Sequence, residues 1–238
     1  MGKDVIVACD FSTEKEVYDF LDLFQQDKPF VKIGMELFYG AGPGIVRNIK
    51  ERGHKIFLDL KCHDIPNTVK KTMKVLASLG VDICNLHAAG TSEMMRAALE
   101  GLKEGAEEQG KERPLLIAVT QLTSTDQEAM ERELLIEKPI DEVVMSYALN
   151  AKNSGLDGVV CSPLEAGKVH QVCGENFLTV TPGVRFKEDS KGDQKRVMTP
   201  SEAKEAGSDY IVVGRPITGA LNPVEAYRRC LEEFISLA

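Results

Sequence analysis

Eight short runs of apolar residues recur along the chain at fairly even spacing. Each is rich in Val, Ile, Leu or Phe and is bounded by polar, Gly or Pro residues. They cover residues 5–11, 30–38, 55–61, 82–89, 115–122, 158–163, 177–184 and 210–217. Nearly continuous apolar runs of this length are typical of parallel strands that are buried on both faces. The pattern therefore predicts a parallel strand at each run.

The segments between these runs have the spacing of amphipathic helices. Residues 12–26 carry apolar side chains three and four apart behind a possible Ser or Thr cap. Residues 66–80 begin with Pro and end with Gly, which suits the first turn of a helix and the position just past its end. Further helices are predicted over residues 91–110, 139–155, 200–208 and 223–236.

Strands that alternate with helices indicate a parallel sheet with crossover helices. No Pro/Gly/Ser-rich linker divides the 238 residues, so we expect one domain over residues 1–238. Eight units in this length favour a closed (β/α)8 TIM barrel. An open doubly wound sheet is the alternative, and it would require one helix assignment to be wrong. The polar stretch at residues 186–202 is too long for an ordinary loop, so it is either disordered or a functional lid.

In barrels of this kind the active site lies at the carboxyl ends of the strands. Asp59 and Lys61 are two residues apart, so their side chains should share one face of a strand, here the barrel interior. An isolated charge there would be costly, so each group needs a partner. Together with Lys32 and Asp64 they form an array that alternates in sign and can pair internally. A purely structural ion pair is the alternative interpretation. Other polar residues at or just after predicted strand ends are Asp10, His87, Gln121, Thr123, Arg185 and Arg215, the last of which follows Gly214.

The last two units carry a second signal, for an anion. The segments at residues 181–185 and 212–217 end the seventh and eighth units, where barrels frequently bind phosphate. Gly214 allows backbone N–H groups to approach an anion closely, and Arg215 can bind it with two parallel hydrogen bonds. A simple turn followed by a surface arginine is the alternative.

Composition and charge exclude several classes of protein. Acidic residues outnumber basic ones, the net charge is −8, and no basic stripe suited to nucleic acid is visible. The six cysteines are isolated and several lie in apolar runs, which indicates reduced, packed thiols. The chain starts without the features of a signal peptide and has no apolar stretch long enough to span a membrane. We expect a cytoplasmic protein that binds neither nucleic acid nor membrane.

The histidines and glycines do not indicate a resident cofactor. His63 and His87 are the ones nearest the charged array, but the four histidines show no ligand spacing such as H-x-x-x-H. No Gly-rich dinucleotide fingerprint is present either. We therefore predict no metal and no cofactor, and we interpret His63 as a packing or hydrogen-bonding residue.

Several segments, taken in chain order, resemble the orotidine 5′-monophosphate decarboxylase family over nearly the whole chain. They are "ACDF", "VKIGMELF", "DLKCHDIPNT", "TPGVR", the loop that contains Gln194, and "VVGRPI". The D-x-K-x-x-D pattern also occurs in sugar-phosphate relatives, whereas "HDIPNT" is typical of the nucleotide decarboxylases. The resemblance implies cofactor-independent conversion of orotidine 5′-monophosphate to UMP and carbon dioxide, in pyrimidine biosynthesis.

The resemblance also implies roles for individual residues. Lys61 would protonate C6 of the pyrimidine as carbon dioxide leaves, and Asp59 would face the substrate carboxylate. Asp64 would complete the array across a homodimer interface, with Thr68 also reaching the partner's substrate. Asp10 and Lys32 would bind ribose hydroxyls, and Thr123 would bind the pyrimidine edge. The phosphate would be bound by Arg185, Gln194, Gly214 and Arg215. A mobile loop at about 184–198 would close over the phosphate.

Three other functions remain open from the sequence. A sugar-phosphate enzyme of the same barrel group would use a divalent metal at the acidic cluster. A Schiff-base aldolase would use Lys61 or Lys32 as a deprotonated amine. A catalytically inactive barrel would serve only as a binding module, although the intact Asp59, Lys61 and Asp64 argue against it.

Overall fold

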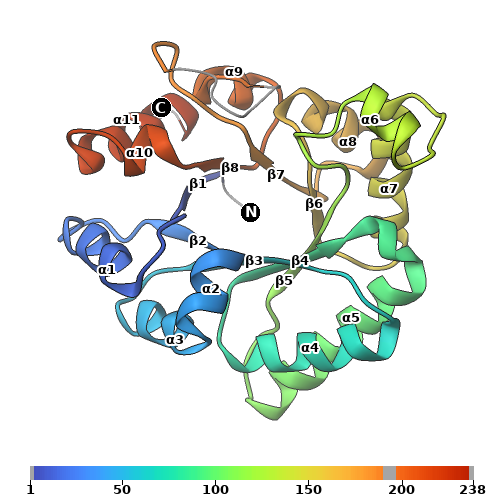
Figure 1. The fold of residues 1–238 in the computed structure, drawn as a ribbon, viewed down its shortest axis with the longest axis horizontal. Helices are drawn as coiled ribbons and strands as arrows, with labels where there is room; N and C mark the ends of the chain where they lie inside the picture. The colour runs from blue at the N-terminus through green and yellow to red at the C-terminus, as the bar shows by residue number, and fades with distance from the viewer. Residues whose placement is uncertain (1–2, 190–196, 236–238) are drawn as a thin grey trace.

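The computed structural model describes residues 3–189 and 197–235, and its strands form a closed parallel barrel (Figure 1). Each strand pairs with the next in the chain, and β8 pairs with β1 to close the ring. The strands are β1 (Asp4–Ala8), β2 (Phe30–Gly34), β3 (Ile56–Cys62), β4 (Ile83–His87), β5 (Leu115–Val119), β6 (Gly158–Val160), β7 (Leu178–Pro182) and β8 (Tyr210–Val213). The predicted closed barrel is therefore confirmed, and the open sheet is wrong.

Helices surround the barrel on the outside (Figure 1). All the predicted helices are present, as α1 (Glu14–Asp22), α4 (Pro66–Ser78), α5 (Thr91–Glu108), α7 (Ile140–Asn153), α9 (Pro200–Glu205) and α11 (Pro223–Ile235). The structure adds α2 (Met35–Ala41), α3 (Gly44–Glu51), α6 (Gln127–Arg132), α8 (Ala166–Cys173) and α10 (Arg215–Thr218), with short 3₁₀ turns at Ala88–Gly90 and Pro163–Glu165. The helix caps are local: the Thr13 hydroxyl accepts from the Glu16 N–H, and Glu16 accepts from the Thr13 N–H.

Two predicted strands are shorter than expected because a helix begins inside the apolar run. The run at residues 30–38 leaves the barrel at Gly34, and Met35–Ala41 continues as α2. The run at residues 210–217 leaves it at Val213, and α10 follows with Pro216 in its first turn. A short apolar run does not distinguish a strand from a buried helical turn, which explains both errors.

Alternation along each strand separates two apolar clusters. On β3, Phe57 belongs to the small cluster inside the barrel, whereas Leu58 and Leu60 pack in the large cluster between strands and helices. The interior cluster is built from Ile6, Ala8, Phe30, Phe57, Ile83, Ile117, Leu178, Val180, Tyr210 and Val212. Lys32 is the register partner of both Ala8 and Phe57, so its side chain belongs to the interior face.

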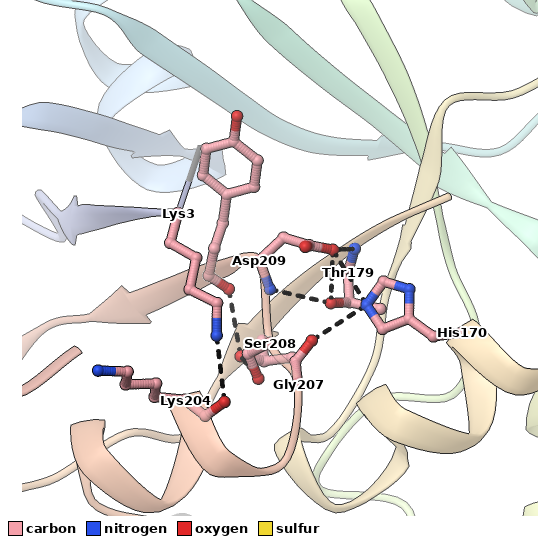
Figure 2. A network of polar contacts seen from close by, with 9 residues as sticks. Lys3, His170, Thr179, Lys204, Gly207, Ser208 and Asp209 are labelled. Atoms are coloured by element: carbon pink, nitrogen blue, oxygen red, sulfur yellow. Dashed lines mark hydrogen bonds and ion pairs between the residues drawn. The ribbon is translucent and has the colours of Figure 1, made fainter. Parts of the chain in front are cut away.

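A polar network holds β7 and β8 together at the amino ends of these strands (Figure 2). The Asp209 carboxylate accepts from the Thr179 N–H at 2.8 Å and from the Thr179 hydroxyl at 3.0 Å. His170 of α8 places Nε2 3.0 Å from the Gly207 carbonyl and 3.3 Å from the same carboxylate. Lys3 donates to the Lys204 carbonyl at 3.1 Å. These contacts fix the two strands whose opposite ends carry Arg185 and Arg215.

Helices α4 and α5 approach each other unusually closely. A Cβ placed on Gly101 would lie 2.0 Å from the Lys70 carbonyl oxygen, and one on Gly105 would lie 2.4 Å from the Lys74 carbonyl oxygen. Glycine at these two positions therefore permits the contact between backbones. Around it, Lys70 pairs with Glu100 and Glu104 at 2.8 Å each. The packing matters for the site because α4 follows directly after the charged segment that ends β3.

Two sequence expectations concern the environment of the chain. No helix within residues 3–189 and 197–235 is both long enough and apolar enough to cross a membrane. All six cysteines lie in these ranges as free thiols; Cys62 is half-buried and the other five are buried, as expected of packed thiols.

Candidate active site

A cavity of about 350 Å³ opens at the carboxyl ends of the strands. Its apolar part is formed by Phe57, Val119, Val160, Pro182 and Val212, and its polar part includes Lys32, Asp59, Lys61, Gln121 and Thr123. An apolar floor with a few convergent charged groups is typical of a site for a small, flat ligand. The cavity lies where a barrel enzyme is expected to bind its substrate.

Asp59 lies between two ammonium groups. Lys61 Nζ donates to Asp59 Oδ1 at 2.7 Å, and Lys32 Nζ lies 3.5 Å from Asp59 Oδ2. Lys32 also donates to Asp10 Oδ1 at 2.9 Å, which extends the chain of charges to the end of β1. The structure thus brings together four of the residues that the sequence singled out, from three neighbouring strands.

The pKa values of the buried pair shift in opposite directions. Burial raises the pKa of the Asp59 carboxyl, but Lys32 and Lys61 outweigh it and hold that pKa below the ordinary 3.8. Burial lowers the pKa of Lys32, but the carboxylates of Asp59 and Asp10 together outweigh this effect and hold that pKa above the ordinary 10.5. Both groups are therefore ionised at neutral pH, and the cavity holds separated fixed charges beside an apolar floor.

Asn85 of β4 is part of this array, although the sequence analysis missed it. Its Nδ2 donates to Asp59 Oδ1 at 2.7 Å, and its Oδ1 accepts from the Lys61 backbone N–H at 2.8 Å. The residue is 1% exposed. The available signal was a polar amide inside the apolar run of residues 82–89, at the same strand parity as His87.

Asp64 lies apart from the other three members of the predicted array. Its side chain is exposed, and its carboxylate accepts from the Ile65 N–H at 2.6 Å. Within one chain the pairing therefore runs from Asp10 through Lys32 and Asp59 to Lys61. The internal pairing of Asp64 suggested by the charge pattern is wrong, whereas its expected role across a homodimer interface stays a prediction. The internal pairing fails because Asp64 follows the end of β3 and turns into the start of α4. Thr68, in the first turns of α4, is exposed on the same segment.

Arg185 and Arg215 line one small cavity of about 120 Å³, together with Asp189 and Pro216. The sequence predicted both arginines as ligands of one phosphate, and the structure does bring them to the same place. The Asp189 carboxylate is held by the Phe186 N–H at 2.9 Å. Gly214 immediately precedes α10, and its carbonyl accepts from the Ile217 N–H at 2.8 Å. Gln194 lies outside the described residues, as does the middle of the predicted loop at 184–198, over residues 190–196.

The two histidines near the array make ring contact with each other. The ring centroids of His63 and His87 are 5.8 Å apart, and His63 is exposed. Burial lowers the pKa of His87, and the neighbouring His63 and Lys61 lower it further, so its imidazole is neutral at pH 7. Among residues 3–189 and 197–235, no three His, Cys, Asp or Glu side chains are grouped as metal ligands.

Comparison with known proteins agrees with this geometry. The profile of the orotidine 5′-phosphate decarboxylase / HUMPS family matches residues 3–230. A Bacillus cytotoxicus protein named orotidine 5′-phosphate decarboxylase is 59% identical over 234 residues, which cover 98% of each chain. A Bacillus cereus (strain G9842) protein of the same name is 58% identical over the same shares.

Solved structures show the same fold over almost the whole chain. The orotidine 5′-phosphate decarboxylase of Lactobacillus acidophilus superposes with a TM-score of 0.88 and is 45% identical, over 98% of this chain and 99% of that one. An uncharacterized conserved protein from Geobacillus kaustophilus superposes with a TM-score of 0.87 and is 50% identical, over 97% and 99%.

Proposed function

The chain belongs to the orotidine 5′-phosphate decarboxylase / HUMPS family, and from this premise we propose that it converts orotidine 5′-monophosphate to UMP and carbon dioxide in pyrimidine biosynthesis. The observation that carries the proposal is the buried Asp59 carboxylate held between the Lys32 and Lys61 ammonium groups, beside an apolar cavity. The names of the relatives at 58–59% identity favour this activity over that of the sugar-phosphate branch.

Lys61 supplies the proton. When the bond between C6 of the pyrimidine and its carboxylate carbon breaks, carbon dioxide leaves and the electron pair stays on C6. The Lys61 ammonium stabilises this developing charge and transfers one proton to C6, and solvent then reprotonates the amine. The supporting observation is that its Nζ is held by Asp59 Oδ1 at 2.7 Å, on the wall of the cavity.

Asp59 faces the substrate carboxylate. Its depressed pKa keeps it ionised, so a bound carboxylate experiences repulsion that is relieved when the substrate's charge moves from the carboxylate onto C6. Lys32 keeps Asp59 charged on one side, as Lys61 does on the other. The array therefore favours the transition state over the bound substrate.

The rest of the nucleotide follows the line of polar groups across the barrel mouth. Asp10 and Lys32 bind ribose hydroxyls, and Thr123 on the cavity wall binds the pyrimidine edge. Arg185 and Arg215, with the backbone at Gly214, bind the phosphate, and Gln194 from the 184–198 loop closes over it. Binding energy from this remote group drives closure of the loop and exclusion of water.

We also propose that two chains form a homodimer in which Asp64 and Thr68 of each chain reach the other chain's substrate. Both side chains are exposed on the segment that leads from β3 into α4. Ile65 between them is 66% exposed, which is unusual for an isoleucine and suits a protein interface. We further propose that the reaction needs neither a metal nor an organic cofactor, because fixed ammonium groups can stabilise the carbanion. We place this activity in the cytoplasm, as is expected of a step in pyrimidine biosynthesis.

The test follows the absorbance change from orotidylate to uridylate, with and without a chelator. We expect turnover that a chelator leaves unchanged and that falls by about 10²–10⁴-fold in Lys61→Ala. Lys15→Ala is the matched control, because Lys15 is a surface lysine that pairs with Asp19 of its own helix. Full turnover in Lys61→Ala would refute the role of that lysine, and loss of orotidylate turnover on chelation would refute cofactor independence. The absence of any turnover of orotidylate would favour the sugar-phosphate branch.

A further inference from the structure

We propose that Asn85 is a positioning residue for the decarboxylation: its side-chain amide holds the Lys61 backbone and the Asp59 carboxylate in the geometry that the reaction requires. This inference rests on the proposed function. Asn85 touches no reacting atom in it and acts only through its two neighbours on β3.

The amide bonds both catalytic partners at once. Asn85 Oδ1 accepts from the Lys61 N–H at 2.8 Å, and Asn85 Nδ2 donates to Asp59 Oδ1 at 2.7 Å. That same carboxylate oxygen accepts from Lys61 Nζ at 2.7 Å. Asp59, Lys61 and Asn85 thus form a closed ring of three contacts. Because Oδ1 of Asp59 receives two donors, the carboxylate plane is fixed and Oδ2 is directed to Lys32.

The backbone of β3 explains why such a clamp is needed. Leu58 pairs with Cys84 and Cys62 pairs with Leu86, so three residues of β3 lie opposite Asn85 alone. Within this bulge Lys61 has φ = 51°, in the left-handed region that a lysine adopts only at a free-energy cost. Bulges redirect side chains and leave backbone groups without ladder partners. Asn85 Oδ1 takes the place of the missing partner for the Lys61 N–H.

A neutral amide is well suited to this position. It donates to Asp59 without adding a charge, so the balance between one carboxylate and two ammonium groups is unchanged. A leucine would leave the Lys61 N–H without its acceptor in a buried site and remove one donor from Asp59. An aspartate would place a second carboxylate against Asp59.

The first experiment compares Asn85→Leu with Ile83→Val, in steady-state kinetics on orotidylate. Ile83 lies on the same strand and the same interior face but is packed in the apolar cluster, so its variant controls for core damage. We expect kcat to fall about 10- to 100-fold in Asn85→Leu with little change in KM, because a misplaced ammonium slows the reaction without loosening the phosphate. Ile83→Val should keep the wild-type kcat.

The second experiment uses Asn85→Asp, which fits the same space. Its carboxyl faces Asp59 and Lys61, with Lys32 and His87 as the next titratable groups, and a buried carboxyl beside another one has a raised pKa. When protonated, it presents one acceptor and one O–H donor, as asparagine does. The ratio of its kcat to the wild-type kcat should therefore rise several-fold as the pH falls from about 8 to about 5.5. A residue with only a structural role would give a ratio that does not depend on pH.

A third measurement does not depend on activity. Loss of the Asn85 hydrogen bond should shift the pKa of Asp59 upward, because that bond favours the ionised carboxylate. Carbon NMR of labelled aspartate would follow this pKa in wild type and in Asn85→Leu, with Asn85→Ala as the second variant if the leucine variant does not fold. An unshifted Asp59, or a pH-independent ratio in Asn85→Asp, overturns the proposal. If the wild type fails to turn over orotidylate, the proposed function is refuted, and the NMR shift alone decides whether Asn85 holds the carboxylate.

Discussion

The Lys61 ammonium lies 2.7 Å from the carboxylate of Asp59, which is two residues earlier on the same strand. Strand alternation places Asp59 on the interior face, and the left-handed backbone at Lys61 within the bulge of β3 brings the Lys61 side chain to the same wall of the cavity. An ion pair that closes over so short a stretch of chain creates a fixed dipole at one wall of the cavity. The predictions below follow from this array and from the packing around it.

Replacing Asp59 by Asn should separate binding from catalysis. Without the carboxylate, Lys32 and Lys61 attract the substrate's anionic groups, and only Asp10, which pairs with Lys32, still opposes them within this array. We expect kcat to fall by about 10²-fold or more while orotidylate binds as tightly as before or more tightly. Single-turnover kinetics and calorimetric titration would measure the two effects. Weaker binding together with an unchanged kcat would contradict repulsion between Asp59 and the substrate.

Arg215→Ala should affect substrates according to whether they carry a phosphate. A charged hydrogen bond contributes about 1.5–3 kcal/mol, so kcat/KM for orotidylate should fall roughly 10- to 100-fold. The phosphate-free nucleoside should react at its wild-type rate. Arg52→Ala serves as the control, because Arg52 pairs with Asp22 on the outer helices. Equal losses on both substrates would argue against a phosphate site at Arg215.

Two glycine variants should have opposite effects on stability. A Cβ on Gly101 would lie 2.0 Å from the Lys70 carbonyl oxygen, so Gly101→Ala must push α4 and α5 apart and should cost about 1–3 kcal/mol. Gly40 lies in α2, and a Cβ placed on it would meet no atom of the described residues within 4 Å beyond its own helix backbone and chain neighbours. Gly40→Ala should therefore be neutral or stabilise by up to about 1 kcal/mol. Urea unfolding at pH 7 measures both. Equal stabilities of the two variants would contradict the close helix contact.

His54 should make the protein less stable in mild acid. Its ring is 2% exposed and its Nδ1–H donates to the Pro29 carbonyl at 2.9 Å, and burial holds its pKa below the ordinary 6.5. As the pH falls, His54 is therefore protonated at a higher pH in the unfolded chain than in the folded chain. The free energy of unfolding should fall as the pH drops below about 6.5, until the folded pKa is passed.

The matched variant for this prediction is His54→Asn, which retains a donor to Pro29 but does not titrate. The wild type should lose more stability than His54→Asn between pH 7 and pH 5, by up to about 1.4 kcal/mol for each unit by which the pKa is lowered. Denaturant unfolding at the two pH values gives the difference. Identical losses would show that His54 has the same pKa in both states.

Much of the site could be predicted from local pattern. Alternation along β3 places Asp59 on the interior face, and strand position places Lys32, Arg185 and Arg215 at the mouth of the barrel. Asn85 was missed because a single buried amide carries no motif. Its importance depends on which residues of β3 lie opposite it, and only the pairing register shows that.

By itself the sequence determined the barrel, since eight buried runs and their intervening helices leave few other ways to cover both faces of a parallel sheet. It also determined which charges lie at the strand ends. Only the tertiary structure decided that Asp64 leaves the array within one chain, that apolar Met35–Ala41 forms a helix, and that Lys61 adopts a left-handed backbone. The physical reason is that side-chain period is a local property of the chain, whereas register, bulges and helix starts depend on contacts with residues distant in sequence.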